Sequence, residues 1–396
     1  MKKILVLLPF LLITACGGSQ ETPPDNSDDD NNTEEKFEYK TVTYSNPLRF
    51  HRQDGSLYTV YAADPDILRC DEDGYFYMYC TNTDCEMGDK GMMYDRGPIF
   101  RSENLIDWTW CGSVFDGHSD AGNWGTPEAG IWAPSIIKVG DTYNYYYSLS
   151  TLGDPNPGIG VATSPTPYGP WTHHGMVLDS ETSGVSNSID PQVLYVGDEL
   201  YIVWGSFFGI AATRLTDDGL EVYSGLDNLK EYITYLIADN TGGNGMNVDI
   251  NYEGSYIIQK DGKYYYFGSQ GTCLSGTDST YTVKVGVSDS FFGPYVGSDG
   301  KDLADLEGSF GDVVVAPSSE VAGTGHNTIV QDFAGKYRIF YHGYAINGEE
   351  PEYRISFMDE LIWDENTGMP YVKDYKASIN EEKQGPTVVD FDKLGE

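Results

Sequence analysis

The sequence predicts an all-β protein folded as a five-bladed β-propeller. One pattern recurs five times along the 396 residues, and it consists of an apolar run, a glycine turn and a run of aromatic residues. Each copy reads as two strands joined by a tight turn. No long segment of the sequence combines a sustained apolar period of 3.6 residues with helix caps. Repeats of this kind indicate an array of similar units.

The five copies have their turn glycines at comparable intervals. The copies read DPDILRCDEDGYFYMY from Asp64, APSIIKVGDTYNYYY from Ala133, DPQVLYVGDELYIVW from Asp190, EGSYIIQKDGKYYYFG from Glu253 and HNTIVQDFAGKYRIFY from His326. The glycines are Gly74, Gly140, Gly197, Gly262 and Gly335, spaced by 66, 57, 65 and 73 residues. DEDG, VGD, KDG and AGK are turn sequences between aromatic and β-branched residues, which favours five hairpins.

A second strand-forming element follows each hairpin, and most of these elements turn and end in a further strand. Each repeat should therefore hold three to four antiparallel strands, which is the content of a propeller blade. Radial repetition also protects strand edges, which an open array would leave unpaired. A sandwich pair or a β-helix is the alternative, but repeats near 60 residues are far too long for β-helix coils. The segment 221–237 is a modest helix candidate.

The N-terminal segment predicts export and attachment to a membrane. Residues 1–16 have a basic start, a short apolar run and LITAC ending in Cys16, which is typical of a signal peptide with a lipobox. Cleavage before Cys16 and lipidation of its thiol would leave the protein anchored in the bacterial cell envelope; a plain signal peptide cut elsewhere is the alternative. Residues 17–38 read as an acidic flexible linker, and residues 39–396 as the propeller.

The charge balance restricts the partners. The formal net charge is −37, from 24 basic and 61 acidic residues. Nucleic acid and anionic membrane surfaces require a basic footprint, so neither is expected, and membrane contact should come only through the lipid anchor. A neutral substrate fits better than a polyanionic one. We also expect the protein to be a monomer. Five cysteines besides Cys16 show no CxxC pair and no zinc spacing.

The first residues of the five copies point to chemistry. In a propeller the equivalent first strands line the central channel, so Asp64, Asp190, Glu253 and His326 should face one another at one mouth. Two carboxyl groups across a pocket suit glycoside cleavage, one protonating the leaving oxygen and one acting on water or sugar. A wide channel favours a carboxyl separation of about 6.5–9.5 Å and therefore inversion. Side chains that could stack on sugar faces are Trp124, Trp132 and Phe207.

Structural duties are the alternative for each of these residues. Asp-Pro at a strand start is common turn chemistry. Asp66 lies on the same strand face as Asp64 and is the rival base. Trp132 could serve in core packing, and His326 could be a hydrogen-bonded core histidine.

Five segments resemble the signature segments of family 43 glycoside hydrolases: AADPDI, IWAPSII, NSIDPQV, YEGSYI and GTGHNTI. The stretches YYSLSTLGDPNPGIGVATS, WGSFFGI and CLSGTDSTYTVKVGVSDSFFGPYVGSDG are similar to segments of arabinan endo-1,5-α-L-arabinanases. The similarity covers roughly residues 60 to 345. It implies a five-bladed propeller that hydrolyses α-1,5-linked arabinan, a plant cell-wall polysaccharide, or arabino-oligosaccharides, with inversion.

The resemblance also implies residue roles. Asp64 would be the general base, Glu253 the general acid, and Asp190 the residue that tunes and orients the acid. His326 matches a histidine beside a central calcium ion, bound directly or through water, and no organic cofactor is implied. Positions that would contact arabinose units are Trp132, Asn187 and Ser206.

Departures from the arabinanase pattern leave other activities open. They are Ala63 before the first Asp-Pro, Thr272 in place of a cysteine, Val287 in place of an arginine and Thr324 in the Gly-x-Gly-His segment. Other family members act as α-L-arabinofuranosidases or β-xylosidases. A hypothesis of another class is a non-catalytic surface protein that binds glycans, although a binder does not need three carboxylates.

Overall fold

The computed structural model describes residues 37–56, 62–86, 92–115, 124–125, 129–238, 252–305, 307–348 and 352–394. Phe37–Glu396 forms one compact unit. The predicted signal peptide, the lipidation site at Cys16 and nearly all of the predicted linker lie outside the described residues. Among the helices that are described, none has the length and apolar character needed to cross a membrane.

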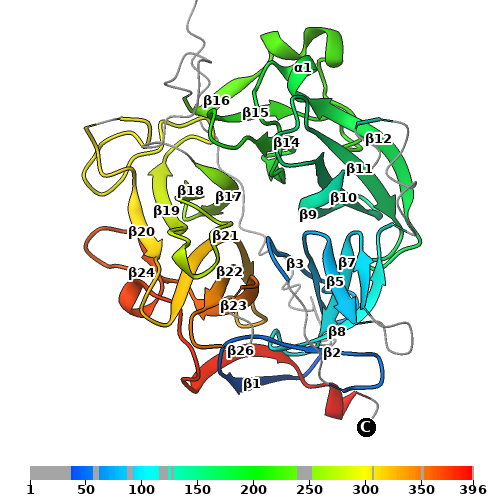
Figure 1. Cartoon of the computed structure of the whole chain (residues 1–396), viewed down its shortest axis with the longest axis vertical. Helices are drawn as coiled ribbons and strands as arrows, with labels where there is room; N and C mark the ends of the chain where they lie inside the picture. Colours follow the sequence, from blue (N-terminus) through cyan, green and yellow to red (C-terminus); the bar gives the residue numbers. More distant parts are fainter. Residues whose placement is uncertain are drawn as a thin grey trace, which may run out of the picture. The chain divides into compact units, whose positions relative to one another are not determined.

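Five antiparallel sheets surround the central axis of this unit and form the predicted five-bladed propeller (Figure 1). The first strands of neighbouring blades contact one another in a closed ring, in the order β3, β9, β13, β17, β21 and back to β3. Clusters of buried apolar residues fill the space between successive sheets. The predicted hairpins are all present, and each supplies the two inner strands of a blade.

The blades contain three to five strands. Blade 1 holds β3 (Asp66–Arg69), β4 (Phe76–Tyr79), β7 (Pro98–Ser102), β8 (Asp107–Ser113) and β2 (Arg49–His51), the last paired in parallel. Blade 2 holds β9 (Gly130–Val139), β10 (Thr142–Ser150), β11 (Gly158–Ser164) and β12 (Thr172–Asp179). Blade 3 holds β13 (Gln192–Val196), β14 (Glu199–Trp204), β15 (Ile210–Arg214) and β16 (Thr234–Ile237). Blade 4 holds β17 (Glu253–Lys260), β18 (Lys263–Gln270), β19 (Thr282–Ser288) and β20 (Asp312–Val315), and blade 5 holds β21 (Val321–Gln331), β22 (Tyr337–Ala345) and β23 (Ile355–Glu360).

Several short elements lie outside the five sheets. Two are hairpins, β5 (Thr83–Glu86) with β6 (Met92–Asp95) and β24 (Ile362–Trp363) with β25 (Pro370–Tyr371). The helical turns are α1 (Ser180–Ser183), η2 (Leu226–Glu231), η3 (Gly276–Asp278), η4 (Lys373–Tyr375) and η5 (Phe391–Lys393). The helix predicted over 221–237 is wrong: this segment forms only the 3₁₀ turn η2 and then β16, because Thr234–Ile237 pairs with β15 as the outer strand of blade 3.

The repeat has a common backbone feature at the channel end of each inner strand. Asp64, Ala133, Asp190 and His326 all have a left-handed φ, between 44° and 60°. In blade 4 the left-handed residue is Gly254, at φ 59°, and Glu253 precedes it. The prediction that Glu253 occupies the same repeat position as Asp64 is therefore wrong by one residue. A glycine adopts this conformation readily, which leaves the preceding position for the carboxyl group.

A ring of side chains joins the five inner strands. The residue two places after each left-handed position bonds to the inner strand of the next blade. Three of these side chains accept a backbone N–H: Asp66 Oδ2 that of Ile136 at 2.8 Å, Ser135 Oγ that of Val193 at 3.1 Å, and Gln192 Oε1 that of Ile257 at 2.6 Å. The other two donate a hydroxyl: Tyr256 to the Ile329 carbonyl at 3.2 Å, and Thr328 to Asp66 Oδ1 at 2.7 Å. The last link returns to blade 1, so the ring is closed by hydrogen bonds as well as by packing.

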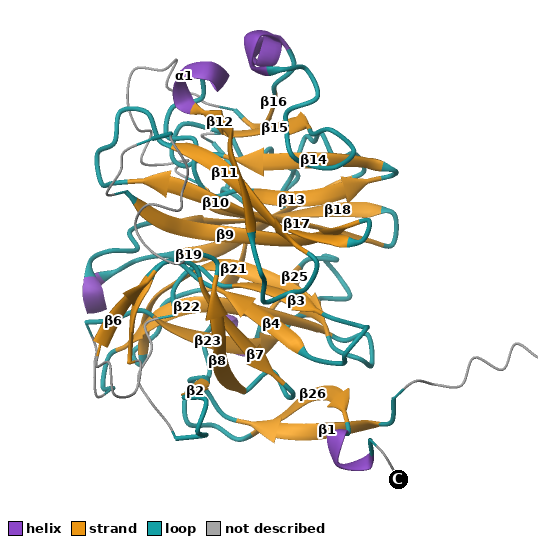
Figure 2. Cartoon of the chain, turned by 90° about the vertical axis from the view of Figure 1, so that its right-hand side faces the viewer, coloured by secondary structure: helices purple, strands orange, loops and turns teal. Residues whose placement is uncertain are grey.

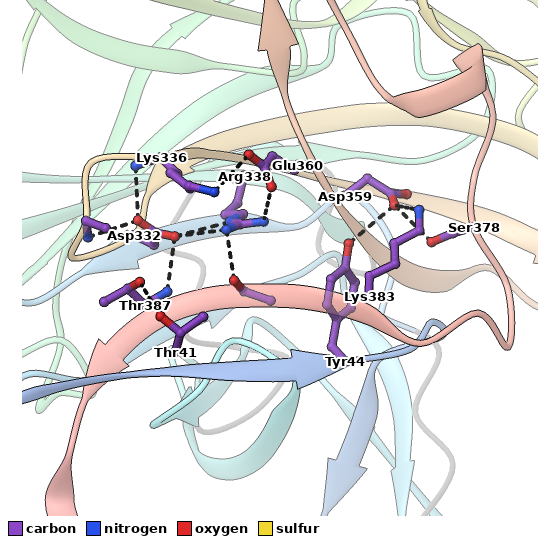
Figure 3. A network of polar contacts seen from close by, with 12 residues as sticks. Thr41, Tyr44, Asp332, Lys336, Arg338, Asp359, Glu360, Ser378, Lys383 and Thr387 are labelled. Carbon is purple, nitrogen blue, oxygen red and sulfur yellow. Dashed lines mark hydrogen bonds and ion pairs between the residues drawn. The ribbon is translucent and has the colours of Figure 1, made fainter.

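The two ends of the described unit form an antiparallel ribbon of β1 (Tyr39–Tyr44) and β26 (Lys383–Val389) beside the fifth and first blades (Figures 1 and 2). Buried polar groups of blade 5 hold this ribbon (Figure 3). Arg338 donates to Asp332 at 3.1 Å and to the Gly385 carbonyl at 3.0 Å, and Asp332 accepts the Thr387 N–H at 3.1 Å. The pattern-based prediction did not include this ribbon.

Candidate active site

Asp64 lies in a polar cage drawn from blades 1 and 5. Its Oδ2 accepts a 2.5 Å hydrogen bond from Thr81, which follows β4. Its Oδ1 lies 3.0 Å from Arg354 Nη1 and 3.0 Å from His342 Nδ1. The carboxyl is nearly buried, so these contacts replace most of the water that would otherwise solvate it.

This cage favours the ionised carboxylate. Burial opposes the charge, but the Arg354 guanidinium, His326 and His342 outweigh it and hold the pKa of Asp64 well below its usual range. Burial also lowers the pKa of His342 to about 4, so its imidazole is neutral near pH 7, and its Nδ1 accepts the N–H of Asp64 at 3.3 Å. Asp64 is therefore an ionised carboxylate with fixed orientation.

Sequence reasoning missed Arg354, His342 and Thr81. His342 lies in β22, three residues before its end, Thr81 lies two residues after β4, and Arg354 precedes β23. None of them is the first residue of a repeat copy, which is the position from which the site residues are predicted. The signal that could have found them is the polar residue ending each aromatic run, since Ser148 and Ser269 occupy the corresponding places.

Asp190 contacts His326 and the main chain next to Glu253. Its Oδ2 accepts the N–H of Gly254 at 3.1 Å and lies 4.0 Å from His326 Nδ1. Burial, reinforced by the charges of Glu253 and Asp64, raises the pKa of Asp190 well above its usual range. Through Gly254, this carboxyl contacts the main chain beside Glu253.

Blade 4 departs from a backbone link that other blades share. The left-handed residues Ala133, Asp190 and His326 donate their N–H groups to hydroxyls from the preceding blade: Thr81 at 2.9 Å, Ser148 at 2.9 Å and Ser269 at 2.8 Å. Gly254 instead donates to Asp190, and the hydroxyl of Ser206 at the corresponding place donates to Glu253 Oε2 at 2.7 Å. The blade with the different hydrogen-bond pattern is therefore the one that carries Glu253.

Glu253 is buried among weak hydrogen-bond donors. Besides Ser206, the Cys273 thiol lies 3.7 Å from its Oε1, and the Tyr281 hydroxyl bonds to it. Burial raises the pKa of Glu253, and Asp64 adds to the rise, while the bonds from Ser206 and Tyr281 oppose it. The outcome is a raised pKa, so Glu253 holds a proton at higher pH than an ordinary glutamic acid.

His326 faces the carboxylates, with Nδ1 3.5 Å from Asp64 Oδ1. Burial lowers its pKa, and Asp64 only partly offsets this. Within the described ranges, no group of three or more His, Cys, Asp and Glu side chains is arranged to hold a metal ion. Calcium prefers six to eight oxygen ligands, so the residues present do not form a protein cage for it. The predicted ion would need water for most of its ligands, and no step below depends on it.

The predicted sugar-contacting residues divide into two groups. Asn187, Ser206 and Phe207 lie beside the acid: Asn187 donates to the Ser206 carbonyl at 3.4 Å, and Phe207 N–H donates to the carbonyl of Tyr252, the neighbour of Glu253, at 3.0 Å. Trp132 is half-buried on β9, next to Ala133 and against Gly130.

Trp124 and Asp66 contact residues that support the fold: Trp124 packs in the core, and Asp66 links neighbouring blades. Trp124 packs on Tyr147 in the core beside blade 2, with ring centroids 6.2 Å apart. Both oxygens of Asp66 are taken by the inter-blade ring, and burial raises its pKa to about 6. Asp66 is thereby a strand link rather than a free carboxylate.

The site joins an ionised carboxylate and a buried carboxyl with raised pKa at one end of the channel. This pair can remove a proton from water and deliver a proton to a leaving oxygen in one pocket, which is the chemistry of glycoside hydrolysis. A family comparison gives the same class. The model of glycosyl hydrolases family 43 matches residues 56–370, and the chain belongs to that family of hydrolases.

Relatives of known sequence and solved structures that are similar to this chain are named as arabinan-type hydrolases. The chain is 29% identical over 288 residues to an arabinan endo-1,5-α-L-arabinosidase of Aspergillus niger, covering 70% of this chain and 81% of the relative. It is 28% identical over 289 residues to an extracellular exo-α-(1→5)-L-arabinofuranosidase of Cellvibrio japonicus, covering 65% and 76%. Its fold is similar to Cellvibrio cellulosa α-L-arabinanase complexed with arabinohexaose, with a TM-score of 0.66 and 23% identity over 80% of this chain and 96% of that one.

Proposed function

We propose that this hydrolase cleaves α-1,5-linked arabinan or arabino-oligosaccharides with inversion at the anomeric carbon. The observation that carries the proposal is that the surroundings lower the pKa of Asp64 and raise the pKa of Glu253 at one mouth of the channel. The choice of sugar rests on the relatives, whose names are an arabinan endo-1,5-α-L-arabinosidase and an exo-α-(1→5)-L-arabinofuranosidase.

The roles follow from the two environments. Asp64, ionised and held by Arg354, accepts a proton from water as that water attacks the anomeric carbon. Glu253, protonated, donates its proton to the departing glycosidic oxygen. Asp190 fixes the main chain at Gly254, and repulsion between its carboxyl and that of Glu253 disfavours ionisation of both together, which favours a proton on the pair. Inversion requires this division of labour, since base and acid act on opposite faces of the sugar.

The setting of the enzyme is a further part of the proposal. Lipidation at Cys16 would hold a monomeric catalytic unit at the bacterial cell envelope, facing neutral plant polysaccharide. A calcium ion beside His326, ligated mostly by water, belongs to the same proposal. The formal net charge of −37 favours an uncharged substrate over a polyanionic one.

The test is a substrate panel with matched variants. Debranched arabinan, arabino-oligosaccharides, and aryl arabinofuranoside and xyloside should be compared with the wild type, Asp64→Asn and Glu253→Gln. Turnover of arabinan that both substitutions reduce by about 100-fold or more supports the proposal. Activity on the xyloside alone would assign a β-xylosidase instead. Arabinan binding without any turnover would assign the glycan-binding alternative.

Oligomers released from the polymer would assign endo action, and arabinose or short units released from chain ends would assign exo action. The second outcome has a specific reason to be tested, because an exo-acting relative matches over a similar length.

A further inference from the structure

The segment 271–281, between β18 and β19, contacts Glu253 from both of its ends. Cys273, near its beginning, has its thiol 3.7 Å from Glu253 Oε1. Tyr281, its last residue, bonds to the same carboxyl through its hydroxyl. A single short loop therefore carries two hydrogen-bond donors, Cys273 and Tyr281, to the carboxyl of Glu253.

Reciprocal bonds close the base of this segment. Thr272 N–H donates to Thr280 Oγ1 at 3.1 Å, and Thr280 N–H donates to Thr272 Oγ1 at 3.2 Å. Tyr281 N–H also donates to the Thr272 carbonyl at 3.1 Å. Tyr344 of β22 donates to the Cys273 carbonyl at 2.8 Å. The two donors to Glu253 are therefore held at a fixed separation.

Strand β21 is shaped to receive the segment. A Cβ at Gly325 would lie 2.1 Å from the Tyr281 ring, and a Cβ at Gly323 would lie 2.6 Å from the Ser279 side chain. The two glycines that precede His326 thus leave the space in which the segment packs. Tyr281 is 1% exposed as a result.

The aromatic ring of Tyr281 also contacts the base side of the site. It stacks on His342, with ring centroids 5.7 Å apart and planes 21° apart. His342 is fully buried and contacts Asp64. Tyr281 therefore packs on the residue that holds the base while its hydroxyl bonds the acid.

We propose that Tyr281 and Cys273 are positioning residues for the general acid, fixing where Glu253 points and how firmly it holds its proton. This inference rests on the proposed role of Glu253. The other titratable groups that act on Glu253 are Asp64 from blade 1 and Asp190 from blade 3. Removing a donor to the carboxylate disfavours the ionised form, so the alkaline limb of kcat/KM should move to higher pH.

The experiment compares leaving groups. Tyr281→Phe and Cys273→Ala should each lower kcat/KM on arabino-oligosaccharides, Tyr281→Phe by about tenfold. The loss should be smaller on an aryl arabinofuranoside whose acidic phenol leaves with little help from an acid. Cys273→Ser should retain more activity than Cys273→Ala, because a hydroxyl can donate in place of the thiol. Tyr295→Phe is the matched control, since that buried hydroxyl bonds the Phe291 carbonyl.

Equal losses on both leaving groups, with an unmoved alkaline limb in both variants, would overturn the inference and leave a purely structural role. Cys273→Ala provides this readout if Tyr281→Phe does not fold. Glu253→Gln distinguishes a failure of this inference from a failure of the proposed role of Glu253 as the acid. If its loss were the same for both leaving groups, the acid assignment itself would fail, and this inference with it.

Discussion

Asp64 and Glu253 carry the same functional group, and their neighbours give them opposite protonation states. Arg354 and His342 face Asp64, whereas Glu253 faces neutral donors and the negative charge of Asp64. Both carboxyls are buried, so burial alone would raise the pKa of each. The guanidinium of Arg354 is the group that separates them.

Removal of that guanidinium should weaken the base in a defined pH range. In Arg354→Met, burial of Asp64 is no longer opposed by the nearest positive charge, so the pKa of Asp64 rises. The acid limb of kcat/KM should move to higher pH, which a pH profile on arabino-oligosaccharides would measure. Arg354→Lys, which keeps a positive charge, should shift the limb less. An acid limb that stays in place in Arg354→Met would contradict the assignment of Asp64 as the base.

At the scale of the element, the inner strands show what sequence could and could not predict. The repeated apolar runs, glycine turns and aromatic runs are sufficient to predict the five blades, because each hairpin is a local sequence pattern. The first residue of the sequence repeat coincides with the left-handed residue in Asp64, Asp190 and His326. In blade 4 the two differ by one position, since only the backbone reveals that Gly254 is left-handed. The inter-blade ring joins residues distant in sequence, and no local pattern marks it.

Asp66 provides a test of that ring. Its folded pKa of about 6 lies above the unfolded value of about 3.9, so the folded state binds more protons between these values. The free energy of unfolding therefore falls as pH rises through this window, by up to about 1.4 kcal/mol per pH unit. Asp66→Asn should remove this decline, which urea unfolding at several pH values would detect.

The same variant separates Asp66 from the base. An asparagine can still accept the Ile136 N–H and face Thr328, so the acid limb of kcat/KM should stay where it is. A loss of activity as large as that of Asp64→Asn would identify Asp66 as the base instead.

At the scale of the whole molecule, two devices close the propeller. The closed ring of inner strands joins blade 5 to blade 1, and the β1–β26 ribbon joins the two ends of the described unit beside the same blades. The ribbon was not predictable from the repeat, because its strands come from opposite ends of the chain and belong to no copy. Its anchor is the pair Arg338 and Asp332, whose side chains are 1% and 0% exposed.

Breaking that pair should destabilise the fold without changing the chemistry. Arg338→Met leaves Asp332 buried without its partner and should cost about 3–5 kcal/mol of unfolding free energy. The double variant Arg338→Met with Asp332→Asn should recover part of this loss, because no buried charge remains. Chemical denaturation measures both, and kcat at a temperature where each variant is folded should match the wild type. Equal stability of the single variant and the wild type would show that the pair does not hold the ribbon.

The propeller brings a base from blade 1 and an acid from blade 4 to one mouth, where both would act on the same glycosidic bond. Proton NMR of the first sugar released from an α-linked arabino-oligosaccharide tests this joint action most directly, because it records the anomer before mutarotation. We expect the β-anomer to form first, through direct attack of water activated by Asp64. First appearance of the α-anomer would mean retention, and would contradict the assignment of Asp64 as a base acting on water.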